Sequence, residues 1–272
     1  MRALSISTAW DETKAIFARD GRLLASVALA MIALPSAISG LVNPSGMADT
    51  NTPAWITGIA IIAALIALAG QLAIIRLALG PSVTVGGAIA HGIRRLPVYF
   101  LAVLLLVIVL LIVAVPIGAV LVAAGVPLER NAPPSGPLVI AALLYVALIC
   151  FLGVRMILSA PVASAEAVGP IGILRRSWEL TAGNWWRLFG FVLMFFIGAV
   201  VVLIAVGSAV GAVLGLTFGG IDPLSLSALI LALVQAFLNA VLTTVFGVML
   251  ARIYVQLTGT AEAQAGVPSS GT

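Results

Sequence analysis

The sequence predicts an all-α integral membrane protein with six transmembrane helices. Of its 272 residues, 62% are apolar and 8% are charged, whereas a soluble domain contains about 25% charged residues. Six apolar segments reach the roughly 20 residues that a helix needs to cross a bilayer core. The runs lack the polar alternation of a membrane barrel strand, so helices are predicted. The predicted spans are 23–42, 54–79, 97–124, 137–161, 186–217 and 226–257.

The order of segments predicts three repeated units, each an interfacial amphipathic helix followed by a helical hairpin. The amphipathic stretches are Ser7–Arg22, Thr84–Leu96 and Gly169–Arg187. Within the first, a helix over Thr8–Asp20, capped by Thr8, is expected to lie on the membrane. The units are approximately 1–80, 81–161 and 162–257, and together they form a single membrane domain of residues 1–257. The small, polar segment 258–272 is predicted to be a disordered cytoplasmic tail.

The net charge of +4 is explained by membrane topology. Of the thirteen basic residues, only Arg130 falls outside the connections and helix ends predicted for one side of the membrane. The positive-inside rule then places both termini in the cytoplasm of a multi-pass protein. We expect a bacterial inner membrane, and nucleic acid is not an expected partner.

Polar residues gather between the fourth and fifth spans. Pro170 opens an amphipathic helix that Gly183 closes, with Ile171, Leu174 and Trp178 on one face. Asn184 is expected to cap the fifth span. This region is the predicted cytoplasmic interfacial element for lipid or partner contact, and its residues are Arg155, Glu166, Arg175, Arg176, Trp178, Glu179, Asn184 and Trp186.

Two further patterns leave alternatives open. Arg76, Arg155 and Arg252 each lie near the cytoplasmic end of an even-numbered span. They could form a polar cluster that holds an anion, or extend separately to the membrane surface. Gly207, Gly211, Gly215 and Gly219 recur every four residues, a spacing that allows close helix packing within the chain or against another subunit.

Catalytic chemistry is not expected. His91 is the only histidine and Lys14 the only lysine, while the one cysteine, Cys150, lies within the fourth span, where a small core residue is expected. Metal sites built from histidine pairs are therefore excluded, and no phosphate-binding glycine loop is present. The sequence predicts no catalytic residue, no metal and no cofactor.

One region resembles a known family. The residues are Arg155-Met-Ile-Leu-Ser-Ala-Pro-Val-Ala-Ser-Ala-Glu166, then Ile173-Leu-Arg-Arg-Ser-Trp-Glu-Leu-Thr181 and Gly183-Asn-Trp-Trp-Arg-Leu188. This stretch resembles the bacterial glycerophosphoryl diester phosphodiesterase membrane-domain family, whose members have six spans. The histidines and acidic metal ligands of that family's soluble catalytic domain are missing here. The resemblance therefore implies a membrane module with a role in lipid or envelope handling, without phosphodiesterase activity.

Two functions follow from these observations. The first is a non-enzymatic inner-membrane module that is lipid- or envelope-related or binds a partner. Its expected partners are membrane lipids, in particular anionic ones, and a protein partner or a second copy of the chain. The alternative is a transporter or channel subunit for a small molecule, an anion or a lipid, which requires a cavity near Arg76, Arg155 and Arg252.

Overall fold

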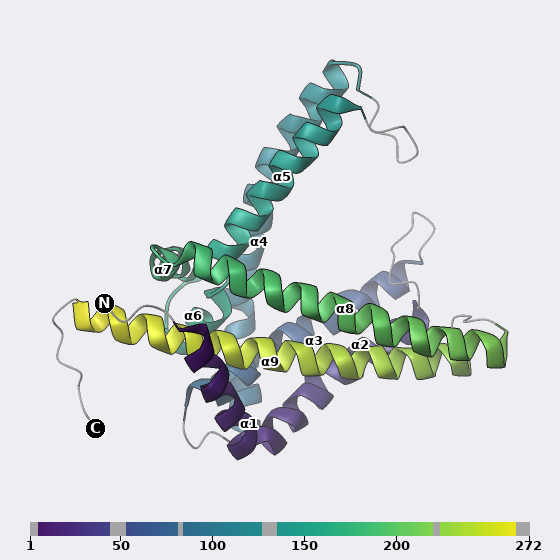
Figure 1. Ribbon diagram of the computed structural model, residues 1–272, viewed down its shortest axis with the longest axis horizontal. Coiled ribbons are helices and arrows are strands. Elements are labelled where there is room, and N and C mark those ends of the chain that lie inside the picture. The colour runs from purple at the N-terminus through teal and green to yellow at the C-terminus, as the bar shows by residue number, and fades with distance from the viewer. Residues whose placement is uncertain (1–4, 44–52, 81–83, 127–134, 220–223, 265–272) are drawn as a thin grey trace.

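The computed structural model describes residues 5–43, 53–80, 84–126, 135–219 and 224–264. Within these ranges every regular element is a helix, and six helical segments are long and apolar enough to cross a membrane. The predicted all-α membrane fold is confirmed. Three pairs of long helices extend from a shared region, which we call the hub (Figure 1). The hub comprises α6 (Ser159–Ala165), α7 (Pro170–Thr181), the beginnings of α1 (Ile6–Ala28) and α4 (Val85–Ala123), and the ends of α3 (Ala54–Leu79) and α9 (Leu226–Gln264).

The first span is continuous with the helix before it. α1 (Ile6–Ala28), a π-helical turn η1 (Leu29–Ala33) and α2 (Leu34–Val42) follow one another without a break. The wider turn precedes Pro35, and the N–H of Leu34 donates to the carbonyl of Leu29, five residues back. Because proline has no N–H, the helix cannot keep its regular pattern at this point.

The N-terminal prediction needs two corrections. Ser5 and not Thr8 is the cap, since its hydroxyl accepts from the backbone N–H of Thr8 at 3.3 Å. In addition, the predicted apolar face of Thr8–Asp20 is partly buried, because Ala9, Thr13 and Ile16 lie inside the protein and α1 contacts α9 and α3. The first helix is therefore a packed part of the hub.

The second unit also differs from the prediction. α3 (Ala54–Leu79) matches the predicted span, but α4 (Val85–Ala123) continues through Pro97. The stretch Thr84–Leu96 is therefore not a separate surface helix. Membrane helices tolerate interior proline because the freed backbone group finds other partners. The hydroxyl of Thr84 caps α4 by accepting from the N–H of Gly87 at 3.2 Å.

The predicted fourth span, 137–161, is interrupted. α5 (Gly136–Arg155) ends before a turn at 156–158, and the short helix α6 (Ser159–Ala165) follows. Pro161 falls in the first turn of α6, where its missing N–H costs nothing. Residues Ala160–Ser164 are buried, and α6 contacts α3, α4, α7 and α9. The segment expected to finish a transmembrane span instead fills the centre of the hub.

The last unit consists of α7 (Pro170–Thr181), α8 (Trp185–Phe218) and α9 (Leu226–Gln264). α8 and α9 run side by side, while α4 and α5 extend away from them (Figure 1). α9 remains helical to Gln264, so residues 258–264 are helical where a disordered tail was predicted; residues 265–272 lie outside the described part. Among the described residues, only the third unit has a separate amphipathic helix, and the predicted uniform repeat is not confirmed.

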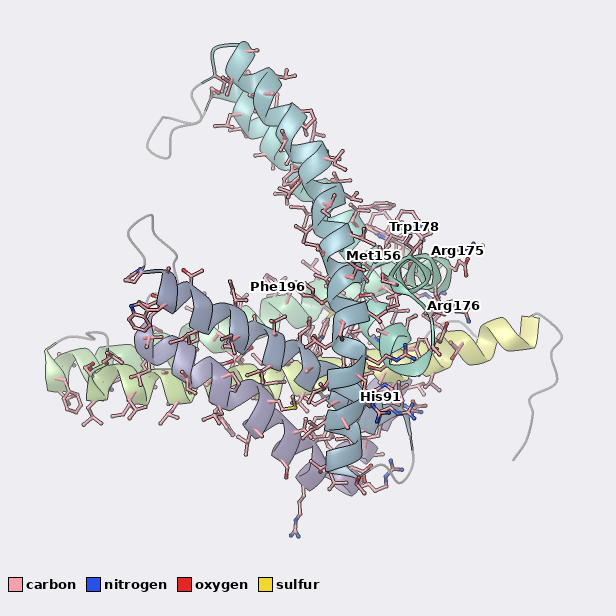
Figure 2. All side chains as sticks on the ribbon, turned by 180° about the vertical axis from the view of Figure 1, so that it is seen from behind. His91, Met156, Arg175, Arg176, Trp178 and Phe196 are labelled. Atoms are coloured by element: carbon pink, nitrogen blue, oxygen red, sulfur yellow. The ribbon has the colours of Figure 1, made fainter. Side chains whose placement is uncertain are left out.

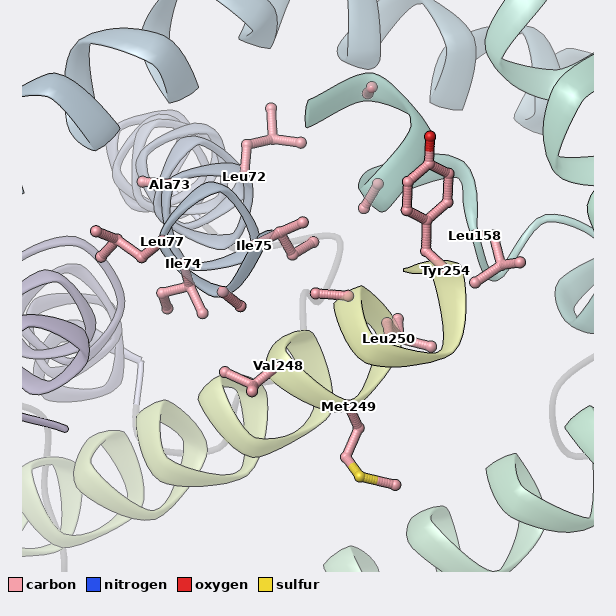
Figure 3. Close-up of a cluster of buried hydrophobic side chains, with 14 of the residues drawn as sticks. Leu72, Ala73, Ile74, Ile75, Leu77, Leu158, Val248, Met249, Leu250 and Tyr254 are labelled. Carbon is pink, nitrogen blue, oxygen red and sulfur yellow. The ribbon is translucent and has the colours of Figure 1, made fainter. Parts of the chain in front are cut away.

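The hub has an apolar core. Leu72, Ile74 and Ile75 of α3 are fully buried, as are Leu250 and Ile253 of α9. Leu158, just before α6, completes this cluster beside Tyr254 (Figure 3). In contrast, the outer halves of α4, α5 and α8 expose leucine, isoleucine and valine along their length. In a bilayer these exposed side chains face lipid.

Candidate functional site: the α7 platform

The candidate site is built on α7. Gly169 precedes the helix with extended backbone, Pro170 begins it, and Gly183 ends the segment with φ of 82°. That left-handed conformation suits glycine, which has no Cβ to clash. The inner face of α7 comprises Ile173, Ser177, Leu180 and Thr181, all buried. This face packs against the bundle, whereas Ile171 and Trp178, which were predicted to share a face, are both exposed.

The outward side carries large apolar and charged groups together. Ile171 is 73% exposed, Trp178 is 40% exposed, and Trp186 at the start of α8 is 77% exposed. Arg175 lies between Ile171 and Trp178 in sequence and forms an ion pair with Glu179, four residues later, at 2.9 Å. We call the surface formed by Ile171, Arg175, Trp178, Glu179 and Trp186 the α7 platform. Arg175 and Trp178 lie on this side of the hub (Figure 2).

Two hydroxyl groups fix α7 to the end of α5. The Ser177 hydroxyl donates to the Arg155 carbonyl at 2.8 Å. The Thr181 hydroxyl lies 3.3 Å from the same oxygen and shares its one proton with the nearer carbonyls of Ser177 at 3.0 Å and Trp178 at 3.1 Å. The last carbonyls of a helix lack partners inside the helix. Because both hydroxyls are buried, they supply a partner where water cannot. This arrangement accounts for the stop of α5 at Arg155.

Glu166 links three elements. Its Oε1 accepts from the Nε of Arg176 at 3.1 Å and from the hydroxyl of Tyr254 at 2.8 Å. Arg176 is therefore the ion-pair partner of Glu166. The carboxylate follows α6, the arginine belongs to α7 and the tyrosine to α9. Arg176 also lies 3.8 Å from the carboxylate of Glu179, three residues later on α7.

The side chain of Arg155 has an aromatic environment. Its Cζ lies 4.8 Å from the ring centroid of Trp178 and 5.5 Å from that of Phe151. The two rings meet edge to face at 5.9 Å. The Nε and Nη1 atoms are buried and have no hydrogen-bond partner among the described residues. Guanidinium groups gain energy on ring faces, but their N–H groups lie in the guanidinium plane and need acceptors.

Further rings extend this cluster along α8. Trp185 lies 5.8 Å from Phe151 and stacks on Phe189 at 5.1 Å, and Trp186 meets Trp185 edge to face at 4.6 Å. Asn184 stands at the cap position of α8 as predicted, but its side chain makes no capping hydrogen bond. Tryptophan is enriched at membrane interfaces because its ring is apolar and its N–H is polar.

The three arginines of the predicted polar cluster have separate environments. Arg76 is in the last turn of α3. Arg252 on α9 forms an ion pair with Glu12 of α1 at 2.6 Å, and this pair links the first helix to the last. Arg155 contacts the rings of Phe151 and Trp178. The structure thus gives Arg155 and Arg252 different partners and shows no contact among the three within the described residues.

The four glycines of α8 also play different roles. A Cβ at Gly207 would overlap the side-chain nitrogen of Gln235 on α9, so this position packs within the chain. Gly211 and Gly215 have no neighbour within 4 Å of such a Cβ. Gly219 ends α8 with φ of 75°. Intramolecular packing therefore accounts for one of the four.

Sequence reasoning missed two helix contacts. Ala69 and Ala73 of α3 face Gly92 of α4, where a Cβ would overlap the Ala69 carbonyl oxygen, and Ala88, one turn earlier in α4, is buried. Ala228, Ala232, Ala236 and Ala240 form a buried row on α9. Both contacts are formed by small residues at intervals of four, a pattern that the sequence analysis used only for the glycines of α8.

Cys150 was expected in the core, but it is exposed on α5.

The described residues contain no group of three or more histidine, cysteine, aspartate or glutamate side chains that could hold a metal ion. A family model described as "Domain of unknown function (DUF7847)" matches residues 4–257. The chain belongs to this family. The match covers all six spans and the α7 platform. No curated protein and no solved structure gave a match. The resemblance to the phosphodiesterase membrane-domain family stays a prediction.

Proposed function

We propose that this polytopic membrane protein is a non-catalytic module of a bacterial inner membrane that contacts lipid headgroups through the α7 platform. One observation carries the proposal. Ile171 is 73% exposed and Trp186 is 77% exposed on the polar end of the protein, beside exposed charged groups. In water such a surface would be unfavourable, whereas the headgroup region accommodates apolar, aromatic and basic groups together.

The position of the platform supports this proposal. It lies at the end of α5 and the beginning of α8, where the apolar spans meet the hub. Lys14, Arg76, Arg94, Arg95, Arg175, Arg176 and Arg252 belong to the elements that form the hub. By the positive-inside rule this end of the protein faces the cytoplasm, where anionic lipids attract basic residues.

The depth of the platform can be measured by spin labelling. In a Cys150→Ala background, nitroxides are attached at Ile171→Cys, at Lys14→Cys as a water-exposed control, and at Leu143→Cys as a lipid-exposed control. The Lys14 side chain is 60% exposed and Leu143 is 64% exposed. After reconstitution in bilayers, collision rates with oxygen and with a water-soluble nickel chelate report the depth of each label. We expect the Ile171 label to lie between the two controls.

An Ile171 label as accessible to the nickel chelate as the Lys14 label would contradict the proposal. The platform would then face water, and a soluble partner protein would be the better explanation of its exposed rings.

The proposed absence of catalysis is tested by a separate assay. Purified protein with and without divalent metal should not hydrolyse glycerophosphodiesters, and metal-dependent turnover abolished by Glu166→Gln would contradict a non-catalytic role.

A further inference from the structure

We propose that Arg155 binds the phosphate group of an anionic membrane lipid at the junction of α5, α7 and α8. The inference rests on the proposed function, because that function places headgroups beside α7. It separates Arg155 from Arg76 and Arg252, with which the sequence grouped it, and assigns a specific site to one side chain.

The first argument is charge. Arg175 and Arg176 each lie within 3.1 Å of a carboxylate oxygen, from Glu179 and Glu166 respectively. Arg252 has Glu12 at 2.6 Å. Arg155 has no carboxylate within ion-pairing distance among the described residues, and its contacts are aromatic rings. It therefore carries a positive charge that nearby acidic residues do not neutralise.

The second argument is hydrogen bonding. The Nε and Nη1 groups of Arg155 are buried without an acceptor among the described residues. Leaving buried donors unsatisfied is costly, more so for charged groups. The rings of Trp178 and Phe151 can balance part of the charge but accept no in-plane hydrogen bond. Phosphate oxygens fit this need, because the guanidinium fork donates in pairs to such groups.

The third argument is access. Arg155 is only partly buried, and its two covering rings reach the surface, with Phe151 38% exposed and Trp178 40% exposed. Trp186 continues this exposed aromatic surface onto α8. To reach Nε and Nη1, a ligand must displace one ring, and the more exposed Trp178 ring is the candidate. The approach is from the side of the platform, where the proposed function places headgroups.

The chemistry favours an anionic lipid over a zwitterionic one. Phosphatidylglycerol and phosphatidylcholine both contain a phosphodiester, but the second also carries a quaternary ammonium. Arg155 repels that cation and already occupies the ring faces that could bind it. A lipid with one net negative charge therefore suits the site better.

Native mass spectrometry of the full chain in detergent tests the site. Delipidated protein is titrated with dioleoylphosphatidylglycerol, with dioleoylphosphatidylcholine, and with inorganic phosphate as a competitor. For the wild type we expect one phosphatidylglycerol to bind more tightly than phosphatidylcholine. Arg155→Gln should weaken that binding by about tenfold, the loss expected for a charge-assisted pair of hydrogen bonds. Arg155→Lys, which keeps the charge without the fork, should give an intermediate loss.

Arg19→Gln is the matched control. It removes the same charge from a residue that is 63% exposed on α1 and pairs with the neighbouring Asp20. Its phosphatidylglycerol binding should equal that of the wild type. If Arg155→Gln does not fold, the site is tested with Arg155→Lys, which retains a cation beside the rings and should still bind phosphatidylglycerol more weakly than the wild type.

Equal phosphatidylglycerol binding by the wild type and both Arg155 variants would overturn the site. Displacement of the lipid by inorganic phosphate, dependent on Arg155, would overturn the lipid assignment in favour of a free anion. The spin-label depth of Ile171 is independent of Arg155. If the Ile171 label lies at headgroup depth but the Arg155 variants bind phosphatidylglycerol like the wild type, only the Arg155 site is rejected. If the Ile171 label is exposed to water, the proposed function is rejected.

Discussion

Gly92 shows how one residue sets the distance between two helices of the hub. Its nearest neighbours across the crossing are backbone atoms of α3, and a Cβ would also lie 3.3 Å from the backbone nitrogen of Ala73. Backbone atoms inside a packed helix cannot rotate away as a side chain can. Any side chain at this position must therefore push α3 and α4 apart.

We predict that Gly92→Ala destabilises the protein by about 1–3 kcal/mol, the usual cost of overpacking a core. Gly207→Ala should cost less, because its Cβ meets only the flexible end of Gln235. Gly211→Ala has no neighbour within 4 Å and serves as the neutral control. Melting temperatures in detergent measure the difference. A Gly92→Ala protein as stable as Gly211→Ala would show that α3 and α4 do not cross as described.

Ser177 and Thr181 form a second critical contact at the residue scale. Ser177 donates to the carbonyl of Arg155, and the Thr181 hydroxyl, which otherwise donates within α7, is near enough to replace it. Ser177→Ala should cost about 1 kcal/mol, the usual net value of one hydrogen bond. Ser177→Ala with Thr181→Val should cost more than the sum of the single changes, because the part-buried carbonyl then has neither donor within reach.

Ser208→Ala is the control for these variants, since its exposed hydroxyl bonds only within α8. A double-mutant cycle on thermal or denaturant unfolding gives the coupling. Strict additivity would indicate that the Arg155 carbonyl finds another partner and that α7 is held to α5 mainly by apolar contacts.

At the scale of elements, the sequence predicted which segments form helices better than it predicted where a helix continues or breaks. Apolar length predicted Ala54–Leu79 correctly at both ends, because Pro53 precedes that run and Gly80-Pro81 follows it in the sequence. Proline was a less reliable guide. Pro97 lies inside a continuous helix, Pro35 widens one turn, and Pro161 lies in the first turn of α6. Which outcome occurs depends on neighbouring helices and on donors such as Ser177, and these are far away in sequence.

The candidate site was likewise predicted only in part from the sequence. Sequence periodicity was sufficient to predict the two faces of α7, since that property is local. It was insufficient to predict that Glu166 pairs with Arg176 or that Tyr254 completes the contact, because Tyr254 lies 88 residues further along the chain. The aromatic environment of Arg155 likewise requires α5 and α7 to pack together.

Glu166 provides the test at this scale, because it joins α6, α7 and α9. Glu166→Ala should destabilise the protein by about 1–3 kcal/mol, since a part-buried arginine and a tyrosine lose their acceptor. Glu166→Gln should cost less, because the amide oxygen can still accept from Tyr254. Asp11→Ala is the control, since Asp11 and its partner Lys14 are 69% and 60% exposed and an exposed ion pair contributes little to stability. Equal stability of Glu166→Ala and Asp11→Ala would show that this link contributes nothing.

For the whole molecule, the hub and the far ends of the helix pairs have opposite chemistry. Most charged groups belong to the hub, while α4 and α5 extend from it with apolar surfaces on all sides (Figure 1). Such surfaces require lipid, so the long helices fix the hub at one membrane surface. The ends of α2, α4 and α8 then lie at the other. This polarity connects the fold with the proposed function, because a headgroup-binding platform must lie at one defined surface.

The orientation predicts which positions react from outside the cell. In a Cys150→Ala background, Ala124→Cys, just after α4, should react in intact spheroplasts with a membrane-impermeant maleimide, whereas Lys14→Cys should react only after the membrane is permeabilised. Ala124 is exposed at the end of a helix pair far from the hub, and Lys14 lies on α1 within it. Immediate labelling of Lys14→Cys together with protection of Ala124→Cys would invert the topology. The α7 platform would then face the outer leaflet, and the positive-inside rule would no longer explain why basic residues gather in the hub.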